Sequence, residues 1–166
     1  MSQVRLLNGS WQQLQEKNRQ YLLSLPNDRL LHSFRITAGM TSSASPFGGW
    51  EKPDSELRGH FTGGHYLSAV ALTYASTGDE DLKKKGDLLV SELHKCQVGN
   101  KNGYLSAFPD DFFDRLRERV QVWAPFYTVH KIMAGMLDMN RHCETYWFPR
   151  IVLWSSAARN KRGPAG

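Results

Sequence analysis

A very short turn between two helix-like segments is the feature that most constrains how this 166-residue chain can fold. The segment from His65 to about Thr77 is apolar nearly all round and rich in small residues, as in a helix buried between others. Gly78 suits the left-handed position after a helix, and Asp79 can cap a second helix that runs to about Gln97. These residues therefore predict a helical hairpin.

Other segments show the same helical spacing. Ser10 can cap a helix over residues 11–24, which ends before Pro26 and carries an apolar stripe. The stripe consists of Trp11, Leu14, Tyr21, Leu22 and Leu25. A shorter helical segment is expected over residues 29–34.

The second half of the chain continues this pattern. Asp110 or Asp111 can cap a helix of one or two turns through Leu116. Pro125 is a good first residue for a final buried helix that runs to about Met139. No alternation of the β type longer than four residues competes with these helices, so the fold class expected is all-α.

A long loop over residues 37–64 interrupts the helices. It contains the motifs Phe-Gly-Gly-Trp-Glu at 47–51 and Arg-Gly-His-Phe-Thr-Gly-Gly-His at 58–65. Loops of about 25 residues inside a compact domain are usually functional or disordered. Because this loop is rich in aromatic side chains, we expect it to be ordered and to form a site.

The net charge of +5 is concentrated near the end of the chain. Residues 141–166 hold five basic side chains and one acidic side chain, so they carry +4 and residues 1–140 carry +1. The lysines at 83–85 lie among carboxylates, and no basic stripe with interleaved aromatic residues is present. We therefore expect no nucleic-acid partner.

The cysteines and the N-terminus restrict the class of protein further. Cys96 and Cys143 have no second cysteine in CxxC spacing, so neither a disulfide framework nor a cysteine-type zinc site can be inferred, and both are interpreted as structural. The chain begins without the apolar segment of a signal peptide and contains no stretch near the ~20 apolar residues of a membrane span. As written it is expected to stay in the cytoplasm, away from membranes, with its true localisation open.

Several rare motifs occur together in one order. They are RGHFTGGHYLSA at 58–69, GYLSAFP at 103–109 and WAPFYTVHK at 123–131, preceded by LLHSFR at 30–35 and FGGWE at 47–51. Over about residues 14–140 this pattern resembles the N-terminal part of the catalytic domain in the glycoside hydrolase family 127 and 146 group, of the β-L-arabinofuranosidase type.

The resemblance implies a fold and a chemistry. The fold is an alpha/alpha six-hairpin barrel, and the reaction is retaining hydrolysis of non-reducing terminal β-L-arabinofuranosides. In the full-length family a zinc-bound cysteine is the nucleophile and a glutamate is the acid/base. No residue here matches those groups, which lie later in the barrel, so we expect neither a catalytic residue nor a zinc ion in this chain.

The resemblance also implies that the chain is truncated. A six-hairpin barrel needs about twelve helices, and this sequence supplies about four substantial ones, so faces that should be covered are expected to remain exposed. Residues 1–140 are interpreted as the N-terminal part of the catalytic domain. Residues 141–166 are interpreted as a non-family tail, frameshifted or disordered. The fragment alone is expected to be inactive.

What the resemblance does carry over is a wall of the sugar pocket. His130 takes the place of an inner-barrel histidine, His60 and His65 face the same cavity, and Trp50, Trp123 and Tyr127 offer flat faces to a furanose. Glu51 and Arg58 are expected to bind hydroxyls. The carbohydrate partner expected is a glycan that contains L-arabinofuranose.

Each of these residues also has a structural interpretation. His130 can be a satisfied core histidine, and Trp50 and Trp123 can be core residues. His60 and His65 are five apart, which is not the spacing of a helical metal pair, and Gly63-Gly64 between them suits a cap or close packing as well as binding. The acidic residues Asp110, Asp111 and Asp114 fit helix N-terminal charge better than a catalytic pair.

Two other classes of function stay open. One is a non-catalytic carbohydrate-binding module that uses the same aromatic and histidine wall. The other is a helical interaction module, which predicts a repeat of about 34–47 residues, and no such repeat is found.

Overall fold

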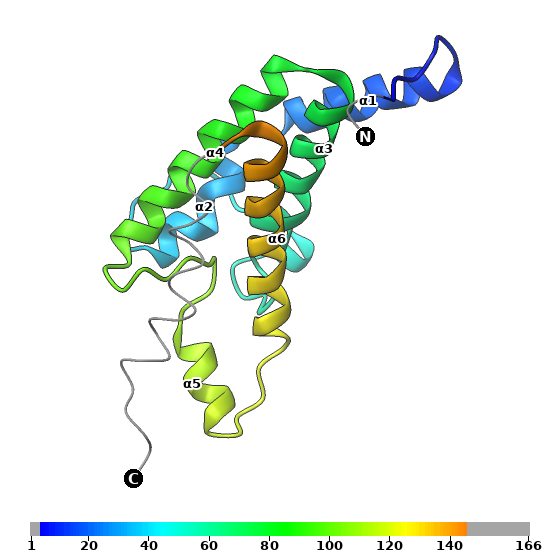
Figure 1. The fold of residues 1–166 in the computed structure, drawn as a ribbon. Helices are drawn as coiled ribbons and strands as arrows, with labels where there is room; N and C mark the ends of the chain where they lie inside the picture. Colours follow the sequence, from blue (N-terminus) through cyan, green and yellow to red (C-terminus); the bar gives the residue numbers. More distant parts are fainter. Residues whose placement is uncertain (1–3, 146–166) are drawn as a thin grey trace.

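The computed structural model describes residues 4–145, and within that range it is all-helical with no strand, as the sequence predicts (Figure 1). Its helices are α1 (Ser10–Ser24), α2 (Asn27–Thr37), η1 (Gly49–Glu51), η2 (His60–Tyr66), α3 (Leu67–Thr77), α4 (Glu80–Gly99), α5 (Asp111–Arg117) and α6 (Pro125–Cys143). No helix in the described part is long and apolar enough to cross a membrane.

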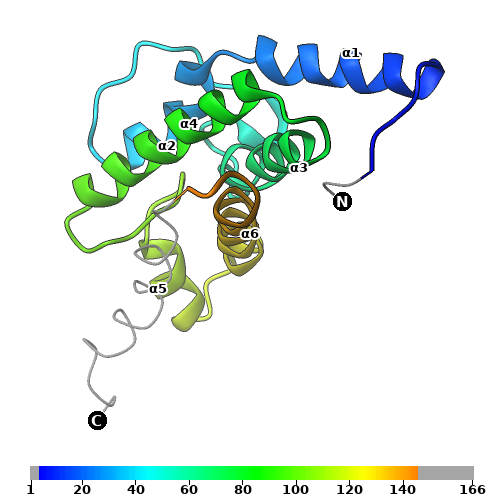
Figure 2. The same cartoon turned by 45° about the horizontal axis from the view of Figure 1, so that its top comes forward.

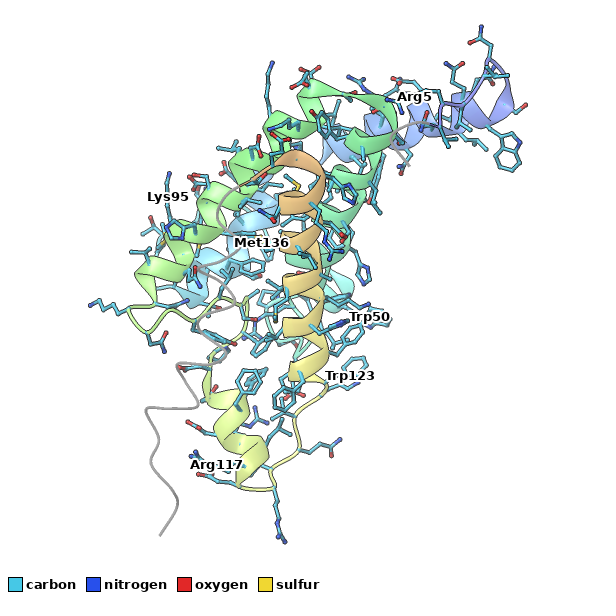
Figure 3. The ribbon with its side chains drawn as sticks, in the orientation of Figure 1. Arg5, Trp50, Lys95, Arg117, Trp123 and Met136 are labelled. Atoms are coloured by element: carbon cyan, nitrogen blue, oxygen red, sulfur yellow. The ribbon has the colours of Figure 1, made fainter. Side chains whose placement is uncertain are left out.

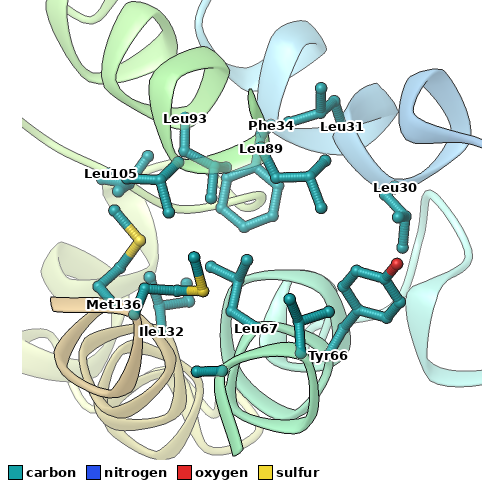
Figure 4. Packing of buried hydrophobic residues seen from close by; sticks show 14 of the residues in the cluster. Leu30, Leu31, Phe34, Tyr66, Leu67, Leu89, Leu93, Leu105, Ile132 and Met136 are labelled. Carbon is teal, nitrogen blue, oxygen red and sulfur yellow. The ribbon is translucent and has the colours of Figure 1, made fainter. Parts of the chain in front are cut away.

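The helices form two sides of one core. α6 lies alongside α3 and η2, while α4 packs against α3 on one side and against α2 and the end of α1 on the other (Figures 1 and 2). Figure 4 shows Phe34 of α2, Leu89 of α4, Leu67 of α3 and Met136 of α6 meeting in this core. α3 is thus a helix buried between others, which confirms the prediction from its apolar composition.

The predicted hairpin between α3 and α4 is present with the local geometry expected. Gly78 has φ 73°, in the left-handed region that closes a helix. The Asp79 carboxylate accepts hydrogen bonds from the backbone N–H groups of Asp81 and Leu82, at 2.9 and 3.0 Å. Asp79 also forms an ion pair with Arg19 of α1, so the turn ties α1 to the hairpin.

η2 and α6 approach each other at glycines. A Cβ added to Gly135 of α6 would lie 2.2 Å from the carbonyl oxygen of Gly63 and 2.6 Å from that of Gly64. A Cβ on Gly64 would lie 2.7 Å from the Cβ of Lys131. Because these neighbours are mostly backbone, only glycine fits, which confirms the close-packing interpretation of Gly63-Gly64.

α1 differs from the prediction at its start and on its surface. Ser10 is the first helical residue and does not cap it, because the helix begins one residue earlier than expected, after Gly9. Of the predicted stripe only Leu22 is buried, and Trp11 is 75% exposed. The first half of α1 extends away from the core in Figure 2, so no other element of the described part covers this face.

Three helices extend beyond their predicted ends, since helix termini are set by contacts as well as by composition. α2 spans residues 27–37 rather than 29–34, and α4 continues to Gly99. α6 continues past Met139 to Cys143, whose side chain is buried in the main core. Cys143, expected at the start of the tail, is therefore part of the helical body, whereas most of the predicted tail (residues 146–166) lies outside the described residues.

Candidate functional site

The long loop is ordered around one buried carboxylate. Glu51, in η1, accepts hydrogen bonds from the backbone N–H groups of Gly59 and Phe61, at 2.8 and 2.9 Å. Gly59 has φ 98° and starts the π-helix η2, so Glu51 places its negative charge at a helix N-terminus. The end of the predicted loop, from His60 on, is thus helical, and Glu51 fixes where that helix begins.

The same carboxylate orients His60. Nδ1 of His60 lies 3.0 Å from Glu51 Oε1 and 2.7 Å from the carbonyl oxygen of Leu57. Both partners are acceptors, so Nδ1 carries the proton and Nε2 is the nitrogen left for a ligand. The hydrogen bond that His60 donates to Glu51 raises the pKa of His60, and the bond to the Leu57 carbonyl adds to this effect, against the opposing effect of burial.

The π-helical turn brings His60 and His65 together. Their ring centroids are 5.7 Å apart and the rings are perpendicular. In a π-helix the backbone hydrogen bonds join residues i and i+5, so side chains five apart lie about one turn apart. The sequence analysis noted only that this spacing is not that of a helical metal pair, and it did not anticipate the contact between the two rings. The pKa of His65 is lowered mainly by its burial and, to a smaller extent, by the charge of the nearby His60.

Three aromatic side chains complete the cluster. The Trp50 ring lies 5.8 Å from His60 and 6.2 Å from Trp123, and Tyr127 lies 6.3 Å from His60. Trp50 is 61% exposed and Trp123 is 53% exposed, so neither is a core residue. Figure 3 shows both indoles beside the first turns of α6. We call His60, His65, Trp50, Trp123 and Tyr127 the aromatic surface. His60 is its buried member, 6% exposed, whereas the other four side chains are exposed.

Sequence reasoning missed one residue at this surface. The ammonium of Lys131 lies 5.2 Å from the centroid of the Tyr127 ring, a cation–π distance. Lys131 follows Tyr127 by four residues on α6, and this i, i+4 spacing was the available signal. A cation therefore stands next to the predicted sugar-binding residues.

Arg58 and His130 are placed differently from the aromatic surface. The Arg58 guanidinium donates to the carbonyl oxygens of Ala107 and Ser55, both at 2.7 Å, and stacks over Phe112. Arg58 thus ties the loop to a second, smaller core cluster, which consists of Tyr104, Phe108, Phe112 and Val122. His130 is exposed on α6, and in the part of the chain described here no ring contact joins it to the aromatic surface.

Neither cysteine has the environment of a zinc ligand. Cys96 and Cys143 are buried and unpaired, and burial raises the pKa of each thiol to about 11. A zinc ligand must be a thiolate, so these thiols do not fit that role. Between residues 4 and 145, no three His, Cys, Asp or Glu side chains converge to hold a metal ion.

A separate polar groove runs along α1. It is lined by glutamines and charged side chains, including Glu16, Arg19 and Asp79, and by no aromatic residue. Since a sugar ring is usually bound against a flat apolar face, the aromatic surface is the better candidate for a carbohydrate site than this groove.

Comparison with known proteins agrees with the motifs. Residues 3–153 match the family model described as β-L-arabinofuranosidase, GH127 catalytic domain. The match runs past residue 140, where the sequence analysis had placed the end of the family region. No curated protein matches the chain. Because the family model covers most of the sequence, the chain belongs to the GH127 β-L-arabinofuranosidase catalytic-domain family of glycoside hydrolases.

Proposed function

We propose that this chain forms part of an enzyme that hydrolyses non-reducing terminal β-L-arabinofuranosides, and that its aromatic surface is one wall of the sugar site. Membership of the GH127 family supports a carbohydrate substrate. The observation that carries the proposal is the cluster in which Trp50 and Tyr127 contact His60 of the His60–His65 pair and Trp123 contacts Trp50. These residues come from three separate elements, which argues for a common role.

The residue chemistry suits a small sugar. The exposed indoles of Trp50 and Trp123 offer apolar faces to ring C–H groups, and their perpendicular arrangement forms a corner that suits a furanose. His60 presents Nε2 with its ring held in place, so it can exchange a hydrogen bond with a sugar hydroxyl. Glu51 and Arg58 are proposed to act indirectly, because their polar atoms bond to the backbone and hold in place the loop that carries these rings.

We do not assign the catalytic groups to residues 4–145. The retaining mechanism, with a zinc-bound cysteine nucleophile and a glutamate acid/base, rests on the family resemblance and would be carried by residues beyond this sequence. We assign no reaction step to residues 4–145, since Glu51 is already bound by three donors and both thiols are buried. We also propose that residues 1–140 contribute to the catalytic domain, together with the rest of α6 to Cys143, since the family match extends to residue 153.

Binding to a simple furanoside tests the sugar site. Methyl β-L-arabinofuranoside is titrated into the full chain and followed by tryptophan fluorescence. Trp123→Ala is expected to weaken binding about tenfold or more, since it removes a stacking face. Trp11→Ala is the matched control, because Trp11 is also exposed but lies on α1, away from the aromatic surface. Equal affinity of the natural and Trp123→Ala chains would contradict the proposal.

A second assay separates the enzyme from a non-catalytic carbohydrate-binding module. Release of p-nitrophenol from p-nitrophenyl β-L-arabinofuranoside is measured with the same chain. Binding without release favours the module, a possibility supported by the lack of converging metal ligands in the described range. Release above the rate of a heat-denatured sample favours an active enzyme.

A further inference from the structure

We propose that the aromatic surface binds an acidic sugar, with the carboxylate of a uronic acid held by Lys131 and by Nε2 of His60. This inference rests on the proposed function, since it names the kind of sugar that the same surface takes. It concerns the charge of that surface, which the family match does not address.

The carboxylates next to the surface are already occupied. Glu51 is buried and receives hydrogen bonds from Gly59 and Phe61 as well as from His60. Glu56 accepts from the backbone N–H of Trp123 at 2.5 Å and pairs with Arg115 at 3.4 Å. Both carboxylates thus have hydrogen-bond partners of their own, and neither forms an ion pair with Lys131 within residues 4–145.

Lys131 is the cation that lacks such a partner. Within residues 4–145, no carboxylate lies at ion-pair distance from its ammonium, which sits instead against the Tyr127 ring. Lys131 is close enough to lower the pKa of both His60 and His65. An ammonium, two imidazoles and a flat aromatic face therefore occupy one small region of the surface.

This arrangement matches one carboxylate attached to a ring. A carboxylate accepts hydrogen bonds through two oxygens, which the Lys131 ammonium and protonated Nε2 of His60 can both donate to. The exposed faces of Trp50 and Trp123 next to them suit the apolar side of a sugar and have no role for a free inorganic anion. Nucleic acid is disfavoured, because the body of the chain carries only +1 in residues 1–140.

The charge on His60 makes the binding depend on pH. His60 faces Glu51 and the Leu57 carbonyl, which favour its protonated form, and Lys131 and His65, of which Lys131 disfavours it. When His60 is protonated, the surface gains a positive charge and a donor at Nε2. Anion affinity is therefore expected to fall as the pH rises through the pKa of His60, while affinity for a neutral sugar is expected to change little.

A matched pair of ligands tests the inference. Methyl β-L-arabinofuranoside is compared with the uronate made by oxidising its C5 hydroxymethyl group, both titrated into the full chain at pH 6 and pH 8.5. At pH 6 the uronate is expected to bind about tenfold tighter, because one charge-assisted hydrogen bond is worth about that factor. The preference is expected to shrink at pH 8.5 and to be lost in Lys131→Gln.

The control is Lys95→Gln, which makes the same change on α4, where the lysine pairs with Glu92, and should keep the preference. Equal binding of the two ligands at pH 6 overturns the inference and leaves the proposed sugar site intact. A preference that persists in Lys131→Gln, or that is unchanged at pH 8.5, also overturns it. The pH comparison uses the natural chain, so it decides the question even where a variant fails to fold. Binding of neither ligand overturns both proposals.

Discussion

At the residue scale, Glu51 connects the loop to the site. Its carboxylate joins η1 to the start of η2 through two backbone donors and orients the His60 ring through Nδ1. From the sequence, Glu51 was expected to bind sugar hydroxyls directly. The structure turns it inward, because three donors converge on it in a buried position where an unpaired N–H would be costly.

Removing this charge should destabilise the protein. Glu51→Gln keeps the size of the side chain but replaces one acceptor oxygen with a donor that faces a backbone N–H. We expect the free energy of unfolding to fall by about 1–3 kcal/mol, the cost of leaving a buried donor unsatisfied. Urea denaturation measures this loss. The control is Glu118→Gln, an exposed position that should change stability little, and equal losses would contradict the role of Glu51.

The pKa values of the two histidines of η2 are shifted in opposite directions, so the two residues should affect stability in opposite pH ranges. The pKa of His60 is raised by Glu51, so protonation of His60 stabilises the folded state. That contribution is fully present below a pH of about 6.5, the value of an ordinary histidine, and is lost as the pH rises through the folded pKa of His60. His65 has a lowered pKa, so its contribution is present above about pH 6.5 and is lost as the pH falls.

Nuclear magnetic resonance of the imidazole Cε1–H signals can measure both pKa values. We expect His60 to titrate above His65, and we expect Glu51→Gln to move the His60 pKa downward because the main cause of its shift is removed. The His65 pKa should move less, because Glu51 is the smallest of the causes that act on it and a less charged His60 offsets its loss. Titration of His60 below His65 in the natural chain would be the opposite of this expectation.

At the scale of elements, the contact between η2 and α6 sets the position of the site. The Gly63 and Gly64 carbonyl oxygens point at Gly135, so the two helices meet backbone to backbone. This contact places Tyr127 of α6 against His60 of η2. The π-helix also decides the direction of His65, so the register of η2 and the position of α6 together assemble the imidazole pair with its aromatic neighbours.

Gly135→Ala is therefore expected to separate η2 from α6. Its new methyl group would lie 2.2 Å from a backbone oxygen that cannot rotate away, and we expect a loss of at least about 1–3 kcal/mol. Gly86→Ala in α4 is the control, because the nearest atom there is the terminal methyl of the flexible Met139 side chain. Thermal melts should show a clearly larger loss for Gly135→Ala. A similar loss for both would mean that η2 can move.

At the scale of the whole molecule, one core holds the helices together. The cluster takes side chains from α1, α2, η2, α3, α4 and α6, with Leu67 of α3 fully buried at its centre. Many of the exposed apolar side chains lie on or before α1 and around the first turn of α6, and others lie on α2, α3 and α4. The expectation that some apolar faces stay exposed is therefore met on α1, where Trp11 has no covering element within the described part.

Truncation of a core leucine should affect the entire fold. Leu67→Ala is expected to lower the free energy of unfolding by about 2–5 kcal/mol through lost burial and a cavity. Leu72→Ala on the same helix is the control, because Leu72 is 38% exposed and should lose much less. Circular dichroism should show one cooperative transition for both variants, at a lower denaturant concentration for Leu67→Ala. Equal midpoints would mean that α3 does not centre the core.

The sequence by itself determined the features that depend on neighbours along the chain. The α3–α4 hairpin follows from a left-handed glycine, an acidic cap and the apolar run before them, all within a few residues. Pro125 opens α6 for the same kind of local reason, through a fixed φ and a missing N–H. The motifs in the loop also indicated the family and most residues of the candidate site.

Only the tertiary structure decided which of those residues lie together on the aromatic surface. Trp50 and Trp123 meet because η1 and the start of α6 pack at the same end of the core, and no local pattern encodes that meeting. The direction of His65 depended on a π-helix, whose five-residue register a search for α-helical spacing does not detect. Glu51 and Arg58 turned inward, and Trp11 outward, because burial and hydrogen-bond partners are properties of segments distant in sequence that only the packed molecule brings together.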